Sequence, residues 1–187
     1  MTIACKMNTS QLDTIMKLDP VSRNCFLGVY PSDLLPARRI SYLNCLIANV
    51  DSHYLPGSHW VAFYFTSSGD GEFFYSYGNP PSYYSNDFTR FISRGSRNSW
   101  TYNSKPLQGE FSSVCGEYTI FFLQKRNRGM TLKQIANIFT KNTSHNDRMV
   151  WRFCKKRFHG IGDMKLKHPS FGDVSRQTAK RKQRVRR

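Results

Sequence analysis

Two runs of aromatic and apolar residues, separated by a turn, constrain the fold more than any other part of this sequence. The runs are residues 59–65 and 72–77, and their composition favours β-strands. The Asp70-Gly71 pair between them is typical of a hairpin turn. The sequence therefore predicts an antiparallel pair of strands, and it also predicts shorter strands at residues 25–30, 45–50 and 99–103.

A polar loop that leads into an apolar helix contains the residue best suited to chemistry. The apolar spacing of residues 120–123 predicts a helix with a broad buried face, and Ser112 and Ser113 are suitable N-cap residues. Cys115 then falls in the first helical turn, where the helix dipole and unpaired N–H groups favour a thiolate. Gln108 lies upstream, in a loop that can return its amide to the sulfur as an oxyanion donor. The alternative is that Cys115 is a small buried apolar residue and Gln108 an ordinary loop amide.

A cysteine nucleophile needs a base, and the chain has five histidines. His59 opens the first strand of the hairpin directly after the Pro56-Gly57 loop, where a strand end can present an imidazole to a cleft. The alternative is a structural histidine. Trp60, the next residue, is either a core residue or a cover for a cysteine–imidazole ion pair through its ring face.

The positive charge of the chain is concentrated at its carboxyl end. The 187 residues include 28 Lys or Arg and 12 Asp or Glu, and residues 152–187 contain 13 of the former and 2 of the latter. We therefore divide the chain into a domain at 1–158 and a basic tail at 159–187, whose composition predicts disorder. The tail is predicted to contact nucleic-acid phosphates or to serve as a nuclear-import signal, and the alternative is a solvated segment.

The cysteines and the hydropathy limit the class of protein further. The five cysteines are widely spaced, and no CxxC or HxxxH pattern is present. This spacing predicts that there is no zinc or other metal site, and free thiols in a reducing, intracellular environment fit best. No run of about 18 apolar residues occurs, so no membrane span is predicted.

Several segments, taken together, resemble the adenovirus-type cysteine proteases, and most closely those of Polinton/Maverick elements and related animal DNA viruses. The most specific part is Gln108 followed, after six residues, by Cys115-Gly116, combined with His59-Trp60 at a strand opening. The other matching segments are residues 26–30, 47–50, 57–63, 76–81 and 146–150. The resemblance spans roughly residues 23–158 and implies an α+β, papain-like fold with a central mixed sheet flanked by helices.

The roles of the family's residues then fall on Cys115 as nucleophile, His59 as general base and Gln108 as oxyanion donor. The backbone N–H of Cys115 is the second donor. The family has an acidic residue that orients the histidine, and Tyr75 stands at that position here. A phenol is neutral near pH 7 and cannot stabilise an imidazolium as a carboxylate does. The resemblance therefore implies a Cys–His dyad or a weakened enzyme, and the alternative is an inactive relic.

The resemblance also implies a substrate, partners and a location. It implies a monomeric endopeptidase domain at 1–158 that cleaves viral or mobile-element structural precursors, such as capsid precursors, during virion maturation in the host nucleus or virion. No cofactor is expected, but DNA is expected as a partner through the basic tail, because DNA and a short peptide activate the adenovirus enzyme. There the peptide is tethered to a cysteine between the acidic residue and the nucleophile, and no Cys lies between Cys45 and Cys115 here. The alternatives are a protease of SUMO or other ubiquitin-like modifiers and a DNA-binding relic of the protease.

Overall fold

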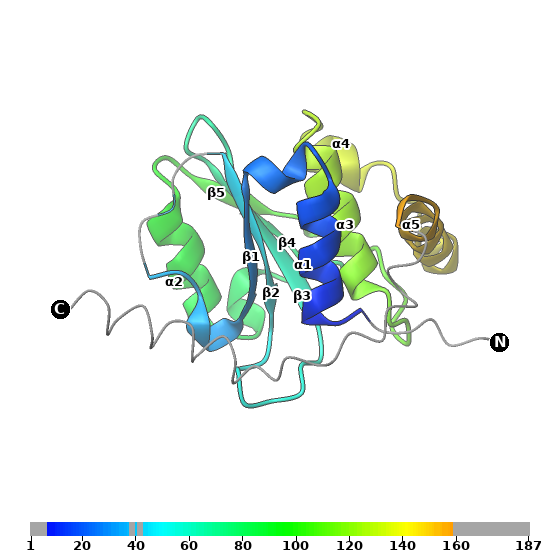
Figure 1. Ribbon diagram of the computed structural model, residues 1–187, viewed down its shortest axis with the longest axis horizontal. Coiled ribbons are helices and arrows are strands. Elements are labelled where there is room, and N and C mark those ends of the chain that lie inside the picture. The colour runs from blue at the N-terminus through cyan, green and yellow to red at the C-terminus, as the bar shows by residue number, and fades with distance from the viewer. Residues whose placement is uncertain (1–6, 38–39, 41–42, 159–187) are drawn as a thin grey trace.

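A five-stranded mixed sheet runs through the centre of the protein (Figure 1). A computed structural model describes residues 7–37, 40 and 43–158, so the basic tail predicted at 159–187 lies outside the described residues. The strands are β1 (Phe26–Pro31), β2 (Asn44–Asn49), β3 (Trp60–Phe65), β4 (Gly71–Phe74) and β5 (Trp100–Tyr102), in this order across the sheet. The outer pairs β1–β2 and β4–β5 are parallel, whereas β3 is antiparallel to both of its neighbours.

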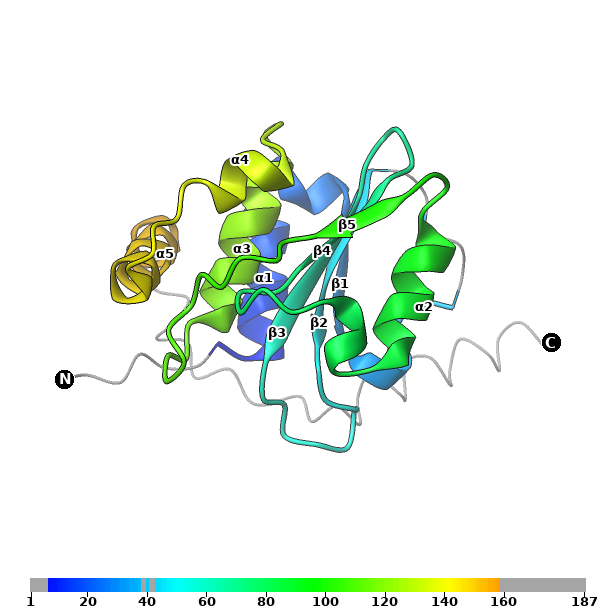
Figure 2. The same cartoon turned by 180° about the vertical axis from the view of Figure 1, so that it is seen from behind.

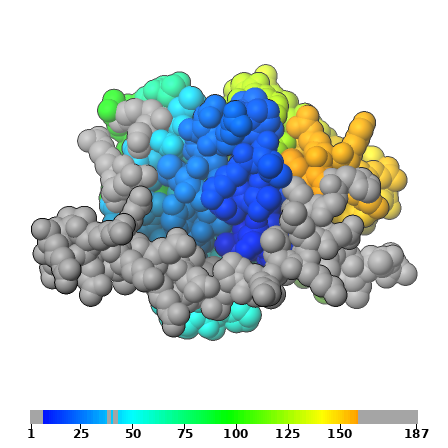
Figure 3. Space-filling view, in the orientation of Figure 1, coloured from blue at the N-terminus to red at the C-terminus, as the bar shows by residue number. Residues whose placement is uncertain are grey.

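Helices cover both faces of this sheet (Figures 1 and 2). They are α1 (Thr9–Leu18), α2 (Asn86–Gly95), α3 (Cys115–Arg126), α4 (Leu132–Ala136) and α5 (Thr143–Arg157). One face is covered by α1 and α3 and the other by α2, while α4 and α5 contact α3, and α1 and α5 reach the surface in Figure 3. The predicted α+β architecture, with a central mixed sheet flanked by helices, is thus confirmed. Within the described part of the chain, no helix has the length and apolar character needed to cross a bilayer.

The central strand β3 is buried on both faces, and its side chains alternate between two cores. Ala62 and Tyr64 lie in the core with α1 and α3. Phe63 and Phe65 lie in the core with α2. Because both faces are covered, the strand is an unbroken apolar run and not an alternation of apolar and polar residues.

The predicted central helix is α3, and it is buried throughout residues 115–124. Its Phe122 ring stacks on Phe74 of β4, with ring centroids 4.4 Å apart and an interplanar angle of 5°. Cys115 is the first helical residue, as predicted. The prediction that Ser112 or Ser113 caps the helix is wrong, since the N-cap residue is Val114, which makes no side-chain capping hydrogen bond.

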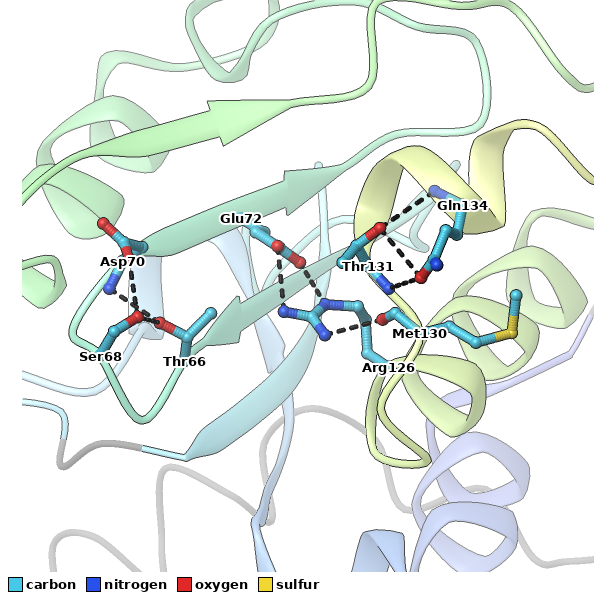
Figure 4. A network of polar contacts seen from close by, with 8 residues as sticks. All are labelled: Thr66, Ser68, Asp70, Glu72, Arg126, Met130, Thr131 and Gln134. Atoms are coloured by element: carbon cyan, nitrogen blue, oxygen red, sulfur yellow. Dashed lines mark hydrogen bonds and ion pairs between the residues drawn. The ribbon is translucent and has the colours of Figure 1, made fainter.

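A partly buried ion pair links the far end of α3 to the sheet (Figure 4). The Arg126 guanidinium donates to both carboxylate oxygens of Glu72 on β4, at 2.6 and 3.1 Å, and to the Met130 carbonyl at 2.7 Å. The Arg126 guanidinium also lies 4.4 Å from the centre of the Tyr64 ring. A two-oxygen contact of this kind sets direction as well as distance. It therefore fixes the helix so that its first residue lies at the opposite end of the sheet.

Replacing Phe122 with Ala is expected to lower the free energy of unfolding by about 3–5 kcal/mol, because it leaves a cavity beside Phe74. Urea titration followed by tryptophan fluorescence measures this change. The control is Phe111→Ala, which removes a ring that is 97% exposed and is expected to change the free energy by less than about 0.5 kcal/mol. Equal losses in the two variants would contradict the packing of α3.

One carboxyl group is enclosed within the packing of α3. Glu117 is buried, and no hydrogen-bond partner for its Oε2 atom is found among the described residues. Burial raises the pKa of Glu117 from 4.5 to about 7; a backbone hydrogen bond opposes this rise and the nearby charge of Asp147 adds to it. The folded chain therefore holds a proton on Glu117 at pH values where the unfolded chain has lost it.

This difference in proton binding predicts a pH dependence of stability. The contribution of the protonated Glu117 is complete below the unfolded pKa of 4.5 and is lost as the pH rises through about 7, a change of about 3 kcal/mol. The glutamine side chain of Glu117→Gln stays neutral, so this variant does not lose that stability. Its free energy of unfolding, relative to that of the wild type, should therefore rise between about pH 5 and about pH 8. Chemical denaturation across this range measures the difference. If the difference in free energy of unfolding between Glu117→Gln and the wild type does not vary with pH, Glu117 does not have the raised pKa.

Candidate active site

The strand β3 and the helix α3 both begin at one end of the sheet (Figure 1). His59 directly precedes β3, Gln108 lies in the connection from β5 to α3, and Cys115 starts α3. Their side chains are buried, with 7%, 3% and 3% of their surfaces exposed, respectively. Residues that are far apart in sequence are therefore buried at, or next to, the starts of β3 and α3.

Ser76 connects His59 to Gln108. Its hydroxyl donates to Gln108 Oε1 at 2.6 Å, and its Oγ lies 3.3 Å from His59 Nε2. The Gln108 amide nitrogen donates in turn to the Ser112 carbonyl at 2.9 Å. The structure thus brings His59 and Gln108 together around a buried serine that the sequence analysis did not single out.

Tyr77 lies beside the imidazole and near the thiol. Its ring centroid is 4.9 Å from that of His59, and the two planes are inclined by 33°. Burial raises the pKa of Tyr77, and the negative charge of a nearby Cys115 thiolate adds to the rise. The Tyr77 hydroxyl donates to the Glu110 carbonyl at 3.3 Å. Tyr77 therefore reaches from the imidazole to the loop that precedes α3.

The first turn of α3 packs closely against the start of α1. A Cβ atom at Gly116 would lie 3.0 Å from Met7 Cβ and 3.2 Å from a Leu12 methyl carbon, so glycine permits this approach. Trp60 belongs to the same core and donates its indole N–H to the Met7 carbonyl at 3.0 Å. This contact supports the core alternative for Trp60.

Tyr75 packs on the imidazole without bringing a charge to it. The predicted strand at 72–77 ends at Phe74, so Tyr75 follows β4. Its ring meets the His59 ring edge-on, with centroids 4.9 Å apart, and its hydroxyl pairs with that of Tyr84 at 2.6 Å. Burial, together with the hydrogen bond to Tyr84, raises the pKa of Tyr75 well above its ordinary value. The phenol is therefore neutral near pH 7.

Side chains of α5 form hydrogen bonds with the backbone of the loop that contains Gln108. Asn146 Nδ2 donates to the Leu107 carbonyl at 3.0 Å, and both carboxylate oxygens of Asp147 accept from the Gly109 N–H at 3.3–3.4 Å. The Tyr118 hydroxyl lies 2.9 Å from the Leu107 carbonyl and 3.0 Å from Asp147. Burial raises the pKa of Asp147, and the hydrogen bonds that it accepts oppose the rise. These contacts limit the movement of the loop on both sides of Gln108.

Sequence reasoning thus missed Ser76 and the two α5 residues, Asn146 and Asp147. All three lie in segments that resemble the protease family, and that is the signal that points to them. The spacing of residues in the sequence does not predict which groups these three side chains contact. Among the residues that the structure describes, no group of three or more His, Cys, Asp or Glu side chains is placed to hold a metal ion.

Comparison with known proteins bears on the fold. No family model matches the sequence, and no curated protein matches it. A solved structure of the ASFV pS273R protease matches with a TM-score of 0.55 and 15% identity, over 76% of this chain and 64% of the other, so this chain spans just under two thirds of that protease.

Two further solved structures match with lower TM-scores. A selenomethionine form of the ASFV pS273R protease has a TM-score of 0.42 at 20% identity, over 57% of this chain and 43% of the other. The central domain of the uncharacterized Lpg1148 protein from Legionella pneumophila has a TM-score of 0.47 at 12% identity, over 84% of this chain and 98% of the other. From the first of the three matches, the fold of this chain is similar to that of a viral cysteine protease.

Proposed function

We propose that this chain is a cysteine endopeptidase in which Cys115 is the nucleophile and His59 the general base. Gln108 and the backbone N–H of Cys115 are the oxyanion donors. The observation that carries the proposal is the attachment of His59 and Gln108 to one serine hydroxyl, at the end of the sheet where α3 begins with Cys115. The similarity of the fold to a viral protease supports the same chemistry.

The proposed reaction proceeds through a thioester. The Cys115 thiolate attacks the carbonyl carbon of the scissile peptide bond, and the resulting oxyanion accepts hydrogen bonds from the two donors. The carbon–nitrogen bond then breaks, and His59 gives its proton to the leaving amine. Water, deprotonated by His59, hydrolyses the thioester and releases the carboxylic acid and the free thiol.

The neutral Tyr75 is the observation that favours a second candidate, an inactive relic of such an enzyme. In a serine triad, removing the carboxylate lowers kcat by about 10⁴-fold. A cysteine site depends less on a third charge, because the thiolate and the imidazolium already stabilise each other. We therefore propose a working enzyme.

The proposed substrates are structural precursor proteins of a virus or mobile element, such as capsid precursors, cleaved in the host nucleus or the virion. The resemblance of the sequence to the adenovirus-type and Polinton/Maverick proteases supports this substrate class. The similarity of the fold to a protease of viral origin supports it as well.

Chloroacetamide is expected to alkylate Cys115 faster than Cys45 and Cys154, because the proposed pairing with His59 holds Cys115 as a thiolate. The pKa of the Cys45 thiol is instead raised by its hydrogen bond to Cys25 and by burial, and that of the Cys154 thiol is raised by burial. His59→Gln should remove this selectivity and slow cleavage of capsid precursors by at least about 100-fold. His145→Gln, at an exposed histidine of α5, is the matched control and should alter neither. Mass spectrometry of the labelled peptides and of the precursor fragments provides both readouts.

Two other results would contradict the proposal. Slow, uniform alkylation of all cysteines that does not depend on His59 would support the relic. Cleavage of a SUMO precursor in the absence of any cleavage of capsid precursors would identify a protease of ubiquitin-like modifiers. Cys115→Ala must abolish cleavage of any substrate for an observed activity to belong to this site.

We also propose DNA as a partner, bound by the basic tail and the outer face of α5. Asp147, the acidic residue of α5, is turned towards Gly109, so the outer face of the helix is basic. Lys155 lies 4.6 Å from the centre of the Trp151 ring, and both side chains are exposed. The exposed cations of this face are Arg148, Arg152, Lys155 and Lys156. Lysine and arginine side chains of this kind contact phosphates without reading the base sequence.

Removing the charges of Arg152, Lys155 and Lys156 together is expected to weaken binding of the full chain to a duplex of about 20 base pairs. The slope of log K against log salt should become shallower by about 2–3, because each lost phosphate contact reduces it by about 0.9. Fluorescence anisotropy at several salt concentrations measures both quantities.

The matched control removes three exposed cations elsewhere, in the variant Lys17→Ala/Arg90→Ala/Lys133→Ala. This variant has the same net charge as the α5 variant but an intact α5 face. An equal loss of affinity in both variants, or an affinity that does not depend on salt, would contradict a phosphate-binding surface on α5.

A further inference from the structure

Ser76 is held in place by its own backbone, independently of what its hydroxyl binds. It follows β4 in a turn closed by the hydrogen bond from the Gly78 N–H to the Tyr75 carbonyl, at 2.8 Å. The Ser76 carbonyl accepts from the N–H groups of Leu107 and Gln108, at 2.8 and 3.2 Å. With 1% of its surface exposed, Ser76 is also shielded from water. Its hydroxyl oxygen therefore occupies a position that the sheet and the Gln108 loop set together.

The hydrogen atoms available at this oxygen decide the direction of its contacts. A hydroxyl has one hydrogen, and Ser76 gives it to Gln108 Oε1 at 2.6 Å. Towards His59 Nε2, at 3.3 Å, the same oxygen therefore accepts. In neutral His59 the proton then lies on Nε2, and Nδ1 is the nitrogen without one.

The same contact orients the Gln108 amide. With Oε1 bound to Ser76, the amide nitrogen points the other way and donates one hydrogen to the Ser112 carbonyl at 2.9 Å. In the proposed mechanism the second hydrogen is the one that meets the oxyanion. An amide turned over by 180° would present an oxygen to the oxyanion and repel it, so the orientation matters for the reaction.

We propose that Ser76 is a positioning residue that sets both the tautomer of His59 and the orientation of the Gln108 amide. This inference rests on the proposed peptidase function. It leaves His59 Nδ1 to take the proton of the Cys115 thiol, and it gives the Nε2–H of the resulting imidazolium a hydroxyl oxygen as acceptor. That is the place of the carboxylate in a Ser-His-Asp triad, occupied here by a neutral group. Tyr75 does not fill this place, because its hydroxyl is bound to Tyr84 and its ring meets the imidazole edge-on.

The direct test is the tautomer of His59 in the intact chain. In nitrogen-15 NMR spectra of the full chain labelled at its five histidines, the His59 signals are the ones lost in His59→Gln. The measurement uses Cys115→Ala, in which no thiol can protonate the ring. Near pH 8 the neutral His59 ring of this variant is expected to be protonated on Nε2, and to become a mixture of tautomers when Ser76→Ala is added. A ring protonated on Nδ1 in Cys115→Ala, or an unchanged tautomer in the double variant, would overturn the inference whether or not the chain has peptidase activity.

Kinetics of the full-length variants provide a second test. Ser76→Ala is expected to lower kcat by about tenfold to 100-fold, since two hydrogen bonds to reacting groups are lost, and to change KM little. Without its acceptor the imidazolium is less stable, so the high-pH limb of the kcat profile should move to lower pH. A loss of rate with an unshifted pH profile, or a rise in KM alone, would assign Ser76 a merely structural role.

The matched control is Ser22→Ala, which removes another buried serine hydroxyl that donates at 2.6 Å, in this case to Asp19. Its kcat and pH profile are expected to equal those of the wild type, whatever it loses in stability. A wild-type chain without activity and without His59-dependent alkylation of Cys115 would defeat the peptidase proposal itself. An active wild type with a Ser76→Ala variant of equal rate would defeat only the role of Ser76.

Discussion

The packing of α3 against the central strands is the constraint on which the remainder of the structure depends. Ten consecutive residues of this helix are buried, so it has little freedom to rotate or slide without opening a cavity. The stacked pair of Phe122 and Phe74 fixes its middle, and the contact of Arg126 with Glu72 fixes its far end. The position of the first helical residue is therefore set by regular structure and not by a loop, which is where a reacting group is held most accurately.

Local patterns in the sequence were enough to predict the hairpin, the central helix and the place of Cys115 in its first turn. Two ends were predicted wrongly for long-range reasons. The strand β4 stops at Phe74 because the Asn103 side chain, 28 positions further along, bonds both the N–H and the carbonyl of Tyr75 at 2.9 Å. The expected serine cap of α3 is replaced by Val114, in a loop whose Ser112 carbonyl is bound to the Gln108 amide. Neither contact can be predicted from the local preferences of the residues for helix, strand or turn.

Some residues of the candidate site could also be predicted from the sequence, and others could not. Cys115, His59 and Gln108 could be named as candidates from the sequence because their segments resemble a known protease family. Ser76 could not, because serine is common in turns, and its position matters only through partners 17 and 32 positions away. Asp147 is a similar case, since its carboxylate reaches back 38 positions to the Gly109 N–H. These residues become visible only when the fold has placed their partners.

The sharing of one oxygen by the imidazole and the carboxamide has a dynamic consequence. Two groups tethered to separate supports fluctuate independently, and their separation then varies by more than either displacement alone. Here the imidazole of His59 and the carboxamide of Gln108 both contact the Ser76 Oγ atom. The backbone carbonyl of Ser76 also links the turn that contains Ser76 to the Gln108 loop. Thermal motion of the turn then carries the imidazole and the carboxamide in the same direction, so their relative geometry is preserved even when both move with respect to the helix.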